Sequence, residues 1–289
     1  MSNFKSLAWY YFCRYFLSFL TDQIFVKVAL SIHSLRFNIP YRLNIKNPKL
    51  FHEKVSFLKL NQKGTLFNRL ADKIHVREYI KEKIGDEFLV QLIGTYDNAD
   101  DINFNILPNQ FVIKTTHGSG WNLICKDKNE LNISNNVSKL NRWLRMDPFF
   151  LSRENHYSKK PKLIIEHYLG ESINDYKMFC FEGKVRFIQV DSDRFLKHKR
   201  CIYDRDWKLQ NFQILYDRPK ASIKKPPILE KMIKLAEQLS NDLFFCRVDM
   251  YYVGGKIYFG EITFYPEGGN CVISPESKDY LMSEQIDLT

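Results

Sequence analysis

The sequence lacks the patterns that would assign it to a zinc-binding, disulfide-linked or secreted class. Its six cysteines stand at positions 13, 125, 180, 201, 246 and 271, with no C-x-x-C pair and no cluster with histidine. This spacing indicates neither a zinc site nor a disulfide framework. No small-residue cleavage site of the signal-peptide kind follows the first apolar stretch. Because unpaired cysteines are typical of a reducing compartment, we expect a cytoplasmic protein.

A long uninterrupted apolar run is also missing. Residues 7 to 35 are rich in apolar and aromatic side chains, but Arg14, Asp22 and Lys27 interrupt them before the ~20 residues that a membrane-spanning helix needs. We therefore predict that residues 1–65 form a helical N-terminal region that buries an aromatic face against the rest of the protein. The alternative is that these helices rest on a membrane surface, which would put the protein at the inner face of the cell membrane.

Internal repeats and low-complexity linkers are absent as well. The chain has 289 residues, of which 45% are hydrophobic and 15% aromatic, enough for one large domain or two closely joined ones. Its formal charge of +10 fits an anionic partner such as nucleotide phosphates, an acidic glycan, nucleic acid or a membrane face. A general bias toward Lys, Asn, Ile, Phe and Tyr explains the same excess.

The periodicity of apolar residues indicates mixed helices and strands. Apolar side chains recur at helical spacing in "LADKIHVREYIKEKIG", between Asp72 as an acidic start and Gly85 as a stop. Helical spacing returns at residues 134–146 and 229–242. Strand-like runs include "FLVQLIGTYD", "NQFVIKTT" and "KLIIEHYLG". Because these elements do not alternate strictly, we predict an α+β fold rather than a doubly wound sheet.

A glycine-containing loop follows Lys114 in "IKTTHGSGWNLICKD", residues 113–127. A Walker phosphate loop requires its lysine after the glycines and a helix behind it, so this loop instead joins two antiparallel strands as a lid. Its glycines permit close backbone approach, and Thr115, Thr116 and Ser119 would add hydroxyl donors to a polyphosphate. An ordinary hairpin turn with a surface lysine is the alternative.

A second pattern lies in "CRVDMYYVGGKIYFGEITFYP", residues 246–266. Two β-rich runs flank Gly254-Gly255, which is a hairpin signal. With a three-residue loop, Asp249 faces Glu261 on one side of the hairpin, beside Arg247 and Thr263. Two facing carboxylates need a cation between them, and Mg²⁺ is suited to oxygen ligands. The opposite face would then carry Val248, Met250, Tyr258 and Ile262. With a two-residue turn, the carboxylates would part to opposite faces.

The segment between these two patterns supplies further polar candidates. Glu166 ends an apolar strand, and Leu169 begins a connection where adenine would find backbone hydrogen bonds. Glu171 or Asp175 would bind the ribose hydroxyls, and Lys177 would point at phosphate. Each of these assignments is nonspecific by itself, because charged residues are common at strand ends.

A basic run lies at residues 193–208, "DRFLKHKRCIYDRDWK". It is interpreted either as a solvated loop or as a platform for an acidic glycan or its precursor. The residues that would form this platform are Arg194, Lys197, Lys199 and Arg200. Nucleic acid is not expected, because stacking aromatics are not interleaved with the basic residues. His156 and His198 lack the neighbours of a catalytic triad and are interpreted as ordinary histidines.

In their order along the chain, these blocks resemble the ATP-grasp superfamily, and closely its TupA-like branch, named for teichuronopeptide biosynthesis. The blocks are "LADKIHVREYI", "FVIKTTHGSGWNLICKD", "IIEHYLG", "DYKMFCFEGKVRFIQVDSDRF" and "RVDMYYVGGKIYFGEITFYPEGG". The resemblance implies two α+β subdomains, at residues 66–165 and 166–289, that hold ATP between antiparallel sheets. It also implies that a carboxylate is phosphorylated and that an amine then attacks the acyl phosphate.

The resemblance also implies roles for individual residues. Lys73 and Lys114 would be the nucleotide lysines, His117, Gly118, Ser119 and Gly120 the mobile phosphate loop, and Glu166 with Leu169 the adenine hinge. Glu171 would be the likelier ribose ligand, with Asp175 as the alternative. Lys177 and Arg247 would contact phosphate or the intermediate, and Asp249, Glu261 and Thr263 would hold magnesium. Thr263 departs from the asparagine found there in many members, which puts a second metal ion in doubt.

These assignments lead to a ligase hypothesis. The chain is expected to use ATP and Mg²⁺ to join an amine to a uronic acid or similar carboxylate in bacterial cell-surface polysaccharide assembly. A kinase acting on a sugar hydroxyl, with Asp191 or Asp193 as its base, is a rival from another reaction class. A non-catalytic nucleotide-binding protein of a glycan-assembly complex is the third hypothesis, and the presence of the lysines and both metal carboxylates argues against it.

Overall fold

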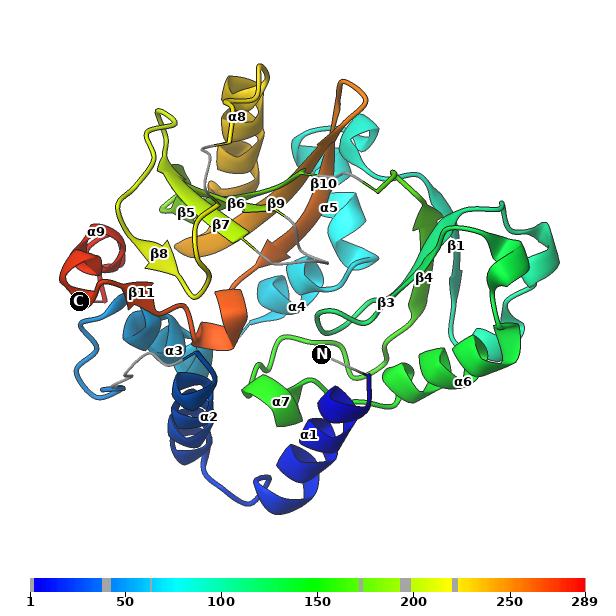
Figure 1. Cartoon of the computed structure of the whole chain (residues 1–289), viewed down its shortest axis with the longest axis horizontal. Helices are drawn as coiled ribbons and strands as arrows, with labels where there is room; N and C mark the ends of the chain where they lie inside the picture. The colour runs from blue at the N-terminus through cyan, green and yellow to red at the C-terminus, as the bar shows by residue number, and fades with distance from the viewer. Residues whose placement is uncertain are drawn as a thin grey trace.

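The computed structural model describes residues 3–37, 43–62, 64–171, 174–192, 199–219 and 223–288. Two main antiparallel sheets and a small one formed by two strands, with helices packed around them, confirm the predicted α+β class (Figure 1). The helices are α1 (Asn3–Phe16), α2 (Asp22–Phe37), α3 (Phe51–Asn61), α4 (Thr65–Ala71), α5 (His75–Lys83), α6 (Ile133–Leu144), α7 (Phe149–Ser152), α8 (Leu229–Ser240) and α9 (Tyr280–Ser283). The strands are β1 (Leu92–Tyr96), β2 (Phe111–Thr115), β3 (Asn122–Cys125), β4 (Leu163–His167), β5 (Asn174–Phe181), β6 (Lys184–Ser192), β7 (Lys199–Asp204), β8 (Gln213–Ile214), β9 (Phe245–Val253), β10 (Lys256–Thr263) and β11 (Ile273–Ser274).

The smaller of the two main sheets has the strand order β1-β4-β2-β3. Alternate residues of β2 point to opposite faces, so Phe111 and Ile113 enter a hydrophobic cluster while Lys114 points away from it. Helix α6 covers that cluster with Leu140 and Trp143. As the sequence predicts, β2 and β3 are antiparallel neighbours joined by the glycine-containing loop.

The larger sheet has the order β10-β9-β5-β6-β7, and all its neighbours are antiparallel. Its main hydrophobic core includes the apolar side of α8, with Met232 and Ile233 among its members. Helix α3 packs Phe51 against Phe179 of β5, with ring centroids 6.2 Å apart. Leu70 of α4 belongs to the same core, although the sequence assigns this helix to the subdomain of the smaller sheet.

The start of α5 follows the sequence signal. The Asp72 Oδ1 atom accepts hydrogen bonds from the backbone N–H groups of Ile74 and His75, at 2.9 and 3.1 Å. A carboxylate in this position satisfies N–H groups that a helix leaves unpaired at its start. Gly85, two residues after the helix, has a φ of +111°. Both predicted boundaries of this helical segment are therefore close to the observed ones.

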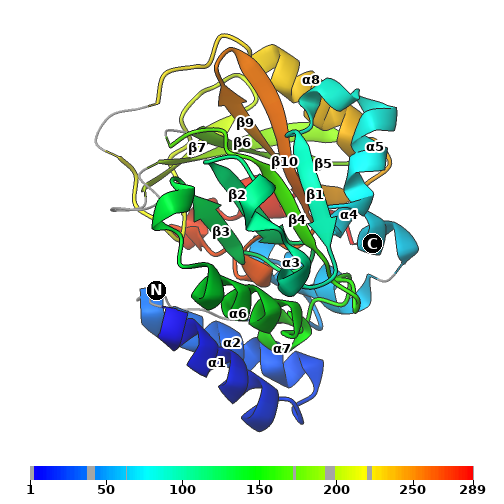
Figure 2. The ribbon, with the colours of Figure 1, turned by 90° about the vertical axis from the view of Figure 1, so that its right-hand side faces the viewer.

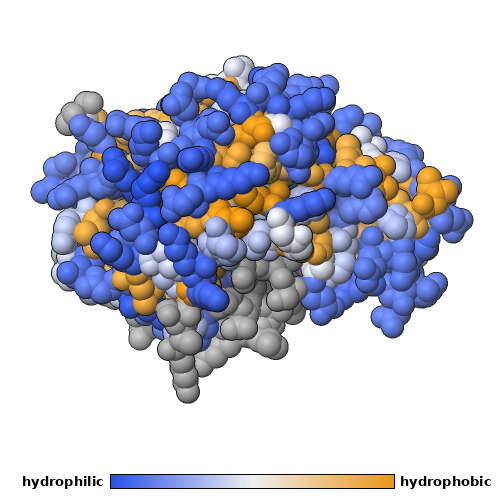
Figure 3. Space-filling model, turned by 90° about the horizontal axis from the view of Figure 1, so that it is seen from above, coloured by the Kyte–Doolittle hydropathy of each residue, from blue (hydrophilic) through white to orange (hydrophobic). Residues whose placement is uncertain are grey.

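Helices α1 and α2 lie together beneath α6 and α7 (Figure 2). Tyr10 and Phe25 are buried there, as expected for helices that pack an aromatic face inward. Other aromatic side chains of the same region remain exposed, including Phe16 at 63% and Phe19 at 78%. The face of the molecule on the side away from α1 and α2 is largely hydrophilic around its edge (Figure 3). Within the described residues, no helix is long and apolar enough to cross a membrane.

Candidate functional site

A cavity of about 730 Å³ is lined by residues from both main sheets, and its volume lies in the range typical of ligand pockets. The smaller sheet and its loop contribute Lys114, Ser119 and Glu166. The larger sheet contributes, among others, Lys177 of β5 and Arg247 of β9. The site is therefore built from segments that lie far apart in the sequence.

The β9–β10 hairpin brings Asp249 and Glu261 opposite each other by a route different from the one the sequence predicts. The turn has two residues, Gly254 and Gly255, because Lys256 pairs with Val253. This is the case in which the carboxylates were expected to separate. The register then shifts between Phe259 and Glu261, so that one extra residue, Gly260, restores the facing pair.

The same register shift changes the composition of the opposite face. Before the shift, Tyr258 pairs with Tyr251, which puts it on the side of the polar row, so its predicted place in the core is wrong. Ile257 and Phe259 are the residues that enter the core there. Val248 and Ile262 lie in the core as predicted.

Strand pairing extends the polar pair into a row across three strands. Lys177 of β5 pairs with Asp249 of β9, which pairs with Glu261 of β10. Within this row the Lys177 Nζ atom forms a short ion pair with Asp249 and lies 2.6 Å from the Asp175 carboxylate. Burial opposes its positive charge, but these two carboxylates outweigh burial and raise the pKa of Lys177.

Arg247 provides the cation between the two facing carboxylates. Its Nε and Nη2 atoms donate to the two oxygens of Asp249 at 2.7 and 2.8 Å, and its Nη2 atom lies 3.4 Å from Glu261 Oε1. The Thr263 hydroxyl donates to the same Glu261 oxygen at 3.0 Å. Although the surrounding protein partly desolvates it, nearby Lys73 and Arg247 lower the pKa of Glu261 to about 2, so this carboxylate is ionised at neutral pH.

The other end of the cavity is formed around Glu166. Its carboxylate binds Lys114 Nζ at 2.7 Å and Arg77 Nη1 at 3.0 Å. Lys73 lies close by and donates from Nζ to the Gly118 carbonyl at 3.0 Å. Because Lys73 is buried, its pKa is lowered, although Glu261 partly opposes this effect. Lys73, Lys114 and Glu261 therefore line one cavity.

The loop after Lys114 presents only some of its polar groups to the cavity. Gly118, Ser119 and Gly120 line it, and Gly118 has a φ of +70°, a conformation that favours glycine. Thr115 and Thr116 are buried and bonded within the protein: the Thr115 hydroxyl donates to the His117 carbonyl, and the Thr116 hydroxyl accepts from Lys162 N–H. The expectation that these two hydroxyls face a polyphosphate is therefore wrong.

Four of the predicted nucleotide residues are not among those that line the cavity, namely His117, Leu169, Glu171 and Asp175. The buried His117 ring lies 2.8 Å from the Met146 carbonyl, and burial lowers its pKa to about 4. Glu171 is an exposed residue whose carboxylate binds Lys126 at 2.6 Å. Asp175 is buried against Lys177. Their proposed contacts with a nucleotide remain predictions.

Of the four residues predicted to form the basic platform, the structure describes Lys199 and Arg200, and they differ in their surroundings. Arg194 and Lys197 lie outside the described residues. Lys199 binds Asp217 at 3.4 Å, whereas Arg200 points into the cavity wall, with only 3% of its side chain exposed. The expectation that Arg200 belongs to a surface platform is therefore wrong, because strand alternation turns it inward.

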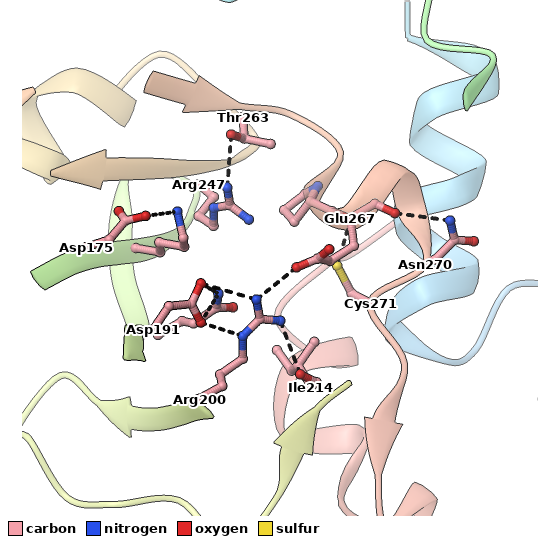
Figure 4. Close-up of polar contacts among 12 residues, drawn as sticks. Asp175, Asp191, Arg200, Ile214, Arg247, Thr263, Glu267, Asn270 and Cys271 are labelled. Carbon is pink, nitrogen blue, oxygen red and sulfur yellow. Dashed lines mark hydrogen bonds and ion pairs between the residues drawn. The ribbon is translucent and has the colours of Figure 1, made fainter. Parts of the chain in front are cut away.

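Arg200 joins two carboxylates on the cavity wall (Figure 4). Its Nε and Nη2 atoms donate to the oxygens of Asp191 at 2.7 and 3.2 Å, and Nη2 also lies 3.0 Å from Glu267 Oε1. The Nη1 atom donates to the Ile214 carbonyl at 3.1 Å. Burial opposes the charge on Glu267, but Arg200 outweighs it and lowers the pKa of that carboxyl.

Several cavity residues were missed at the level of the sequence. Arg77 lies on the polar side of α5, where the sequence suggests an exposed residue. Only the tertiary fold brings its side chain to Glu166. Glu154, His156 and Tyr157 lie in the segment between α7 and β4 and line the cavity. Of these three, only His156 was named from the sequence, as an ordinary histidine. Their sequence, "RENHY", matches no motif considered above. A run of four consecutive polar residues, Arg153 to His156, ahead of β4 was the available signal.

The side chains of the β9–β10 hairpin that could bind a metal ion do so through oxygen atoms. Asp249, Glu261 and Thr263 supply two carboxylates and a hydroxyl, and 36% of the Glu261 side chain is exposed. Within the described residues, no group of three or more His, Cys, Asp or Glu side chains is placed to hold a metal ion. A hard cation at this position would therefore need oxygens from a ligand in addition to the protein.

Comparison with known proteins gives one family match. A family model described as TupA-like ATPgrasp matches residues 53–287. A search of curated proteins found no match to the chain. Among solved structures, the chain is similar to D-alanine–D-alanine ligase from Bacillus anthracis, with 19% identity, a TM-score of 0.44, and coverage of 68% of this chain and 57% of that chain.

Two further solved structures show comparable similarity. The Bacillus anthracis ligase complexed with ATP is 17% identical, with a TM-score of 0.43 and coverage of 82% of this chain and 62% of that chain. The ligase from Helicobacter pylori is 16% identical, with a TM-score of 0.42 and coverage of 75% and 61%. The chain thus spans less than two thirds of the length of each of these proteins.

Proposed function

The chain belongs to the TupA-like ATP-grasp family, and we propose that it is an ATP- and Mg²⁺-dependent carboxylate–amine ligase. Membership of this family implies ATP-dependent chemistry of the ligase type. One observation carries the proposal for this chain: Lys73, Lys114, Lys177 and Arg247 line the same cavity as Glu261. Such a set of fixed positive charges is suited to a triphosphate and to a phosphoryl group in transfer.

The proposed reaction forms an acyl phosphate and then an amide. Lys177 and Arg247 would neutralise the negative charge of the phosphoryl group as it passes from ATP to the substrate carboxylate. Both side chains are suited to this role because acidic neighbours raise their pKa values and keep them charged. No nucleophilic side chain is needed, since phosphoryl transfer depends mainly on positioning and charge neutralisation.

Mg²⁺ fits the oxygen donors of the hairpin. Glu261 and Thr263 would hold it at the cavity surface, and Asp249 would support them from the opposite strand. Mg²⁺ is usually held by one or two carboxylates together with substrate phosphates. Glu261 is the hairpin carboxylate that lines the cavity, whereas both oxygens of Asp249 are bonded to Arg247 and Lys177. When bound, the ion supplies positive charge to the β- and γ-phosphates.

The rival kinase hypothesis receives less support. A hydroxyl kinase needs a base near its acceptor, and Asp191 is the described candidate. Both oxygens of Asp191 accept hydrogen bonds from Arg200 and from the Gln189 amide, so the group is engaged in the cavity wall. Asp193 lies outside the described residues.

The basic side chains of the cavity are the reason for proposing an acidic substrate. A uronic acid or a related carboxylate, carried on a precursor of a bacterial cell-surface polysaccharide such as capsule or O-antigen, would pair with one of the six lysine and arginine side chains that line the cavity beside five acidic ones. The amine would enter the same cavity. We place this activity in the cytoplasm, where ATP is available.

A peripheral contact with the inner membrane face is part of the same proposal. Of residues 3–37, only Asp22 is acidic, while Phe16, Phe19 and Leu35 are exposed at 63%, 78% and 84%. Exposed aromatic and aliphatic side chains on basic helices are typical of segments that bind at a lipid surface. A lipid-linked glycan precursor would then lie close to the enzyme.

Hydroxylamine trapping tests the ligase reaction. With ATP, Mg²⁺ and D-glucuronate, a ligase produces the hydroxamate, because hydroxylamine intercepts the acyl phosphate. A hydroxyl kinase consumes ATP under the same conditions and leaves a stable phosphate ester without hydroxamate. ATP consumption with the ester as sole product would contradict the ligase proposal.

A further inference from the structure

One wall of the cavity comes from the segment that joins α7 to β4. Arg153 begins it in the left-handed region, at a φ of +61°, and is buried between the N-terminal helices. Its guanidinium lies 3.9 Å from the centroid of the Phe25 ring, and its Nη2 atom donates to the Leu17 carbonyl at 3.0 Å. With Arg153 anchored in this way, the next residue, Glu154, turns into the cavity wall.

The Glu154 carboxylate lies beside the turn that follows β10. A Cβ atom placed on Gly268 would be 3.7 Å from Glu154 Oε1, so the carboxylate contacts the turn at residues 266–269. That turn begins three residues after Thr263. Glu154 is only 8% exposed. It therefore lies near the proposed metal residues.

Glu154 differs from the other carboxylates of the cavity in its partners. Glu166 is paired with Lys114 and Arg77, Asp191 and Glu267 with Arg200, and Glu261 with Arg247. Within the described part of the chain, no lysine or arginine lies within ion-pair distance of Glu154, and its neighbour is His156, whose Nε2 atom is 3.4 Å from Glu154 Oε2. Burial raises the pKa of Glu154, although Lys59, beyond ion-pair distance, and hydrogen bonds with Ser152 and Tyr157 oppose this effect. A cationic ligand would therefore favour the charged form of this carboxylate.

His156 gives a second, independent sign of a missing ligand. Its side chain is 6% exposed, and its Nδ1 atom is buried without a hydrogen-bond partner among the described residues. Burial lowers the pKa of His156 to about 4, so the imidazole is neutral at physiological pH and does not serve as the cation for Glu154. Tyr157, Phe264 and Tyr265 surround the ring.

We propose that Glu154 and His156 form the subsite for the amino group of the acceptor substrate. This inference rests on the proposed ligase function. Lys73, Lys114, Lys177 and Arg247 make the rest of the cavity suitable for phosphates and a carboxylate, and the other acidic residues of its lining are already paired with lysine or arginine. Glu154 offers the opposite charge at a short distance from that centre.

The proton balance of the second step fits this assignment. The ammonium group gives one proton to Glu154, and the nitrogen lone pair then forms the bond to the acyl carbon. The bond from that carbon to the phosphate oxygen breaks, and its electron pair leaves with phosphate. The second proton of the nitrogen passes to the released phosphate, while Glu154 returns its proton to solvent.

Two nucleophiles separate this subsite from the first half of the reaction. With ATP, Mg²⁺ and D-glucuronate, wild-type protein is supplied either with hydroxylamine, which is largely uncharged at neutral pH, or with methylamine, which is an ammonium ion there. Hydroxamate and methylamide are then measured by mass spectrometry. In Glu154→Gln we expect hydroxamate formation within about twofold of wild type, and methylamide formation reduced by about 10²-fold or more, the size typical of a lost acid–base group.

Each outcome decides a different claim. Wild-type protein that forms no hydroxamate contradicts the proposed function itself. Wild-type protein that forms hydroxamate but no methylamide contradicts the amine subsite, as does a Glu154→Gln variant that loses both products equally while ATP still raises its melting temperature. If Glu154→Gln fails to fold, Glu154→Asp is the second variant. It keeps the carboxylate but moves it back by one methylene group. This variant should then require more methylamine for half-maximal rate, with unchanged hydroxamate formation, and equal losses of both products would overturn the proposal.

Discussion

Asp249 and Glu261 face each other across the β9–β10 hairpin because Gly260 is an extra residue in β10. The two-residue turn alone would direct the carboxylates to opposite sides of the sheet. The extra residue turns Glu261 back toward Asp249, which pairs with Lys177 of β5 on its other side. The candidate metal site thus depends on the backbone at Gly260 as much as on the acidic side chains.

Substitution of Gly260 tests this dependence. A Cβ atom there would lie 3.0 Å from the Asp249 carbonyl oxygen and 3.2 Å from the Tyr251 ring, so the backbone must shift. For Gly260→Val we expect a loss of about 1–3 kcal/mol in the free energy of unfolding, as for other overpacked sites, and reduced ATP turnover. Urea denaturation and an ATPase assay measure the two effects. Gly254→Asn, at an open turn position, is the control, and a Gly260→Val variant no less stable than this control would contradict the bulge argument.

Lys114 is expected to bind ATP through its charge. Lys114→Met should raise the KM for ATP by roughly tenfold to a hundredfold, because a charge-assisted hydrogen bond contributes about 1.5–3 kcal/mol. Lys83→Met is the matched control, since Lys83 forms an ion pair of 2.8 Å with Asp242 and neither residue lines the cavity. Steady-state kinetics at saturating Mg²⁺ compares the two. Equal effects of both substitutions would show that Lys114 has no special role in nucleotide binding.

His117 is expected to make the protein sensitive to acid. Burial lowers its pKa from the ordinary 6.5 to about 4, so the folded state binds fewer protons than the unfolded state between these pH values, and stability is lost as pH falls through this window. The contribution lost between pH 7 and pH 5 is about 2 kcal/mol. His117→Gln should therefore show a smaller difference in unfolding free energy between pH 7 and pH 5. Substitution of His75, whose side chain is 66% exposed, should leave the difference unchanged; a His117→Gln variant with the wild-type difference would contradict the prediction.

The exposed aromatic residues of α1 and the turn after it are expected to bind anionic lipid. Wild-type protein should sediment with phosphatidylglycerol vesicles, and Phe16→Ser with Phe19→Ser should weaken this binding by at least tenfold, because burying one such side chain contributes about 1.5–3 kcal/mol. Ile106→Ser removes an equally exposed apolar side chain, 74% exposed, from a different part of the surface and should have no effect. Equal vesicle binding by all three proteins would exclude this surface as the contact.

The sequence allowed the elements to be predicted where local signals are strong. The Asp72 cap, the helical spacing of residues 229–242 and the loop between β2 and β3 all appear in the structure, since each depends on neighbouring residues alone. The facing of Asp249 and Glu261 was predicted on the assumption of a wrong turn length. A β-bulge is set by the pairing of two strands, and a single glycine within β10 was too weak a signal to reveal it.

Side-chain direction was harder to predict than the elements. Arg200 was assigned to a charged surface run, but its place in β7 turns it toward Asp191 and Glu267. Glu154 was not recognised at all, because its position depends on Arg153 being held by the N-terminal helices far away in the sequence. Contacts of this kind arise from tertiary packing, which local periodicity does not encode.

The central claim is that the cavity transfers the γ-phosphoryl group of ATP to a carboxylate oxygen. D-Glucuronate labelled with ¹⁸O in its carboxylate, incubated with ATP, Mg²⁺, hydroxylamine and the wild-type protein, tests this claim most directly. We predict that the released phosphate carries one ¹⁸O atom per hydroxamate formed, and that Glu261→Gln releases almost none. Phosphate that is released by wild-type protein without ¹⁸O would contradict the account.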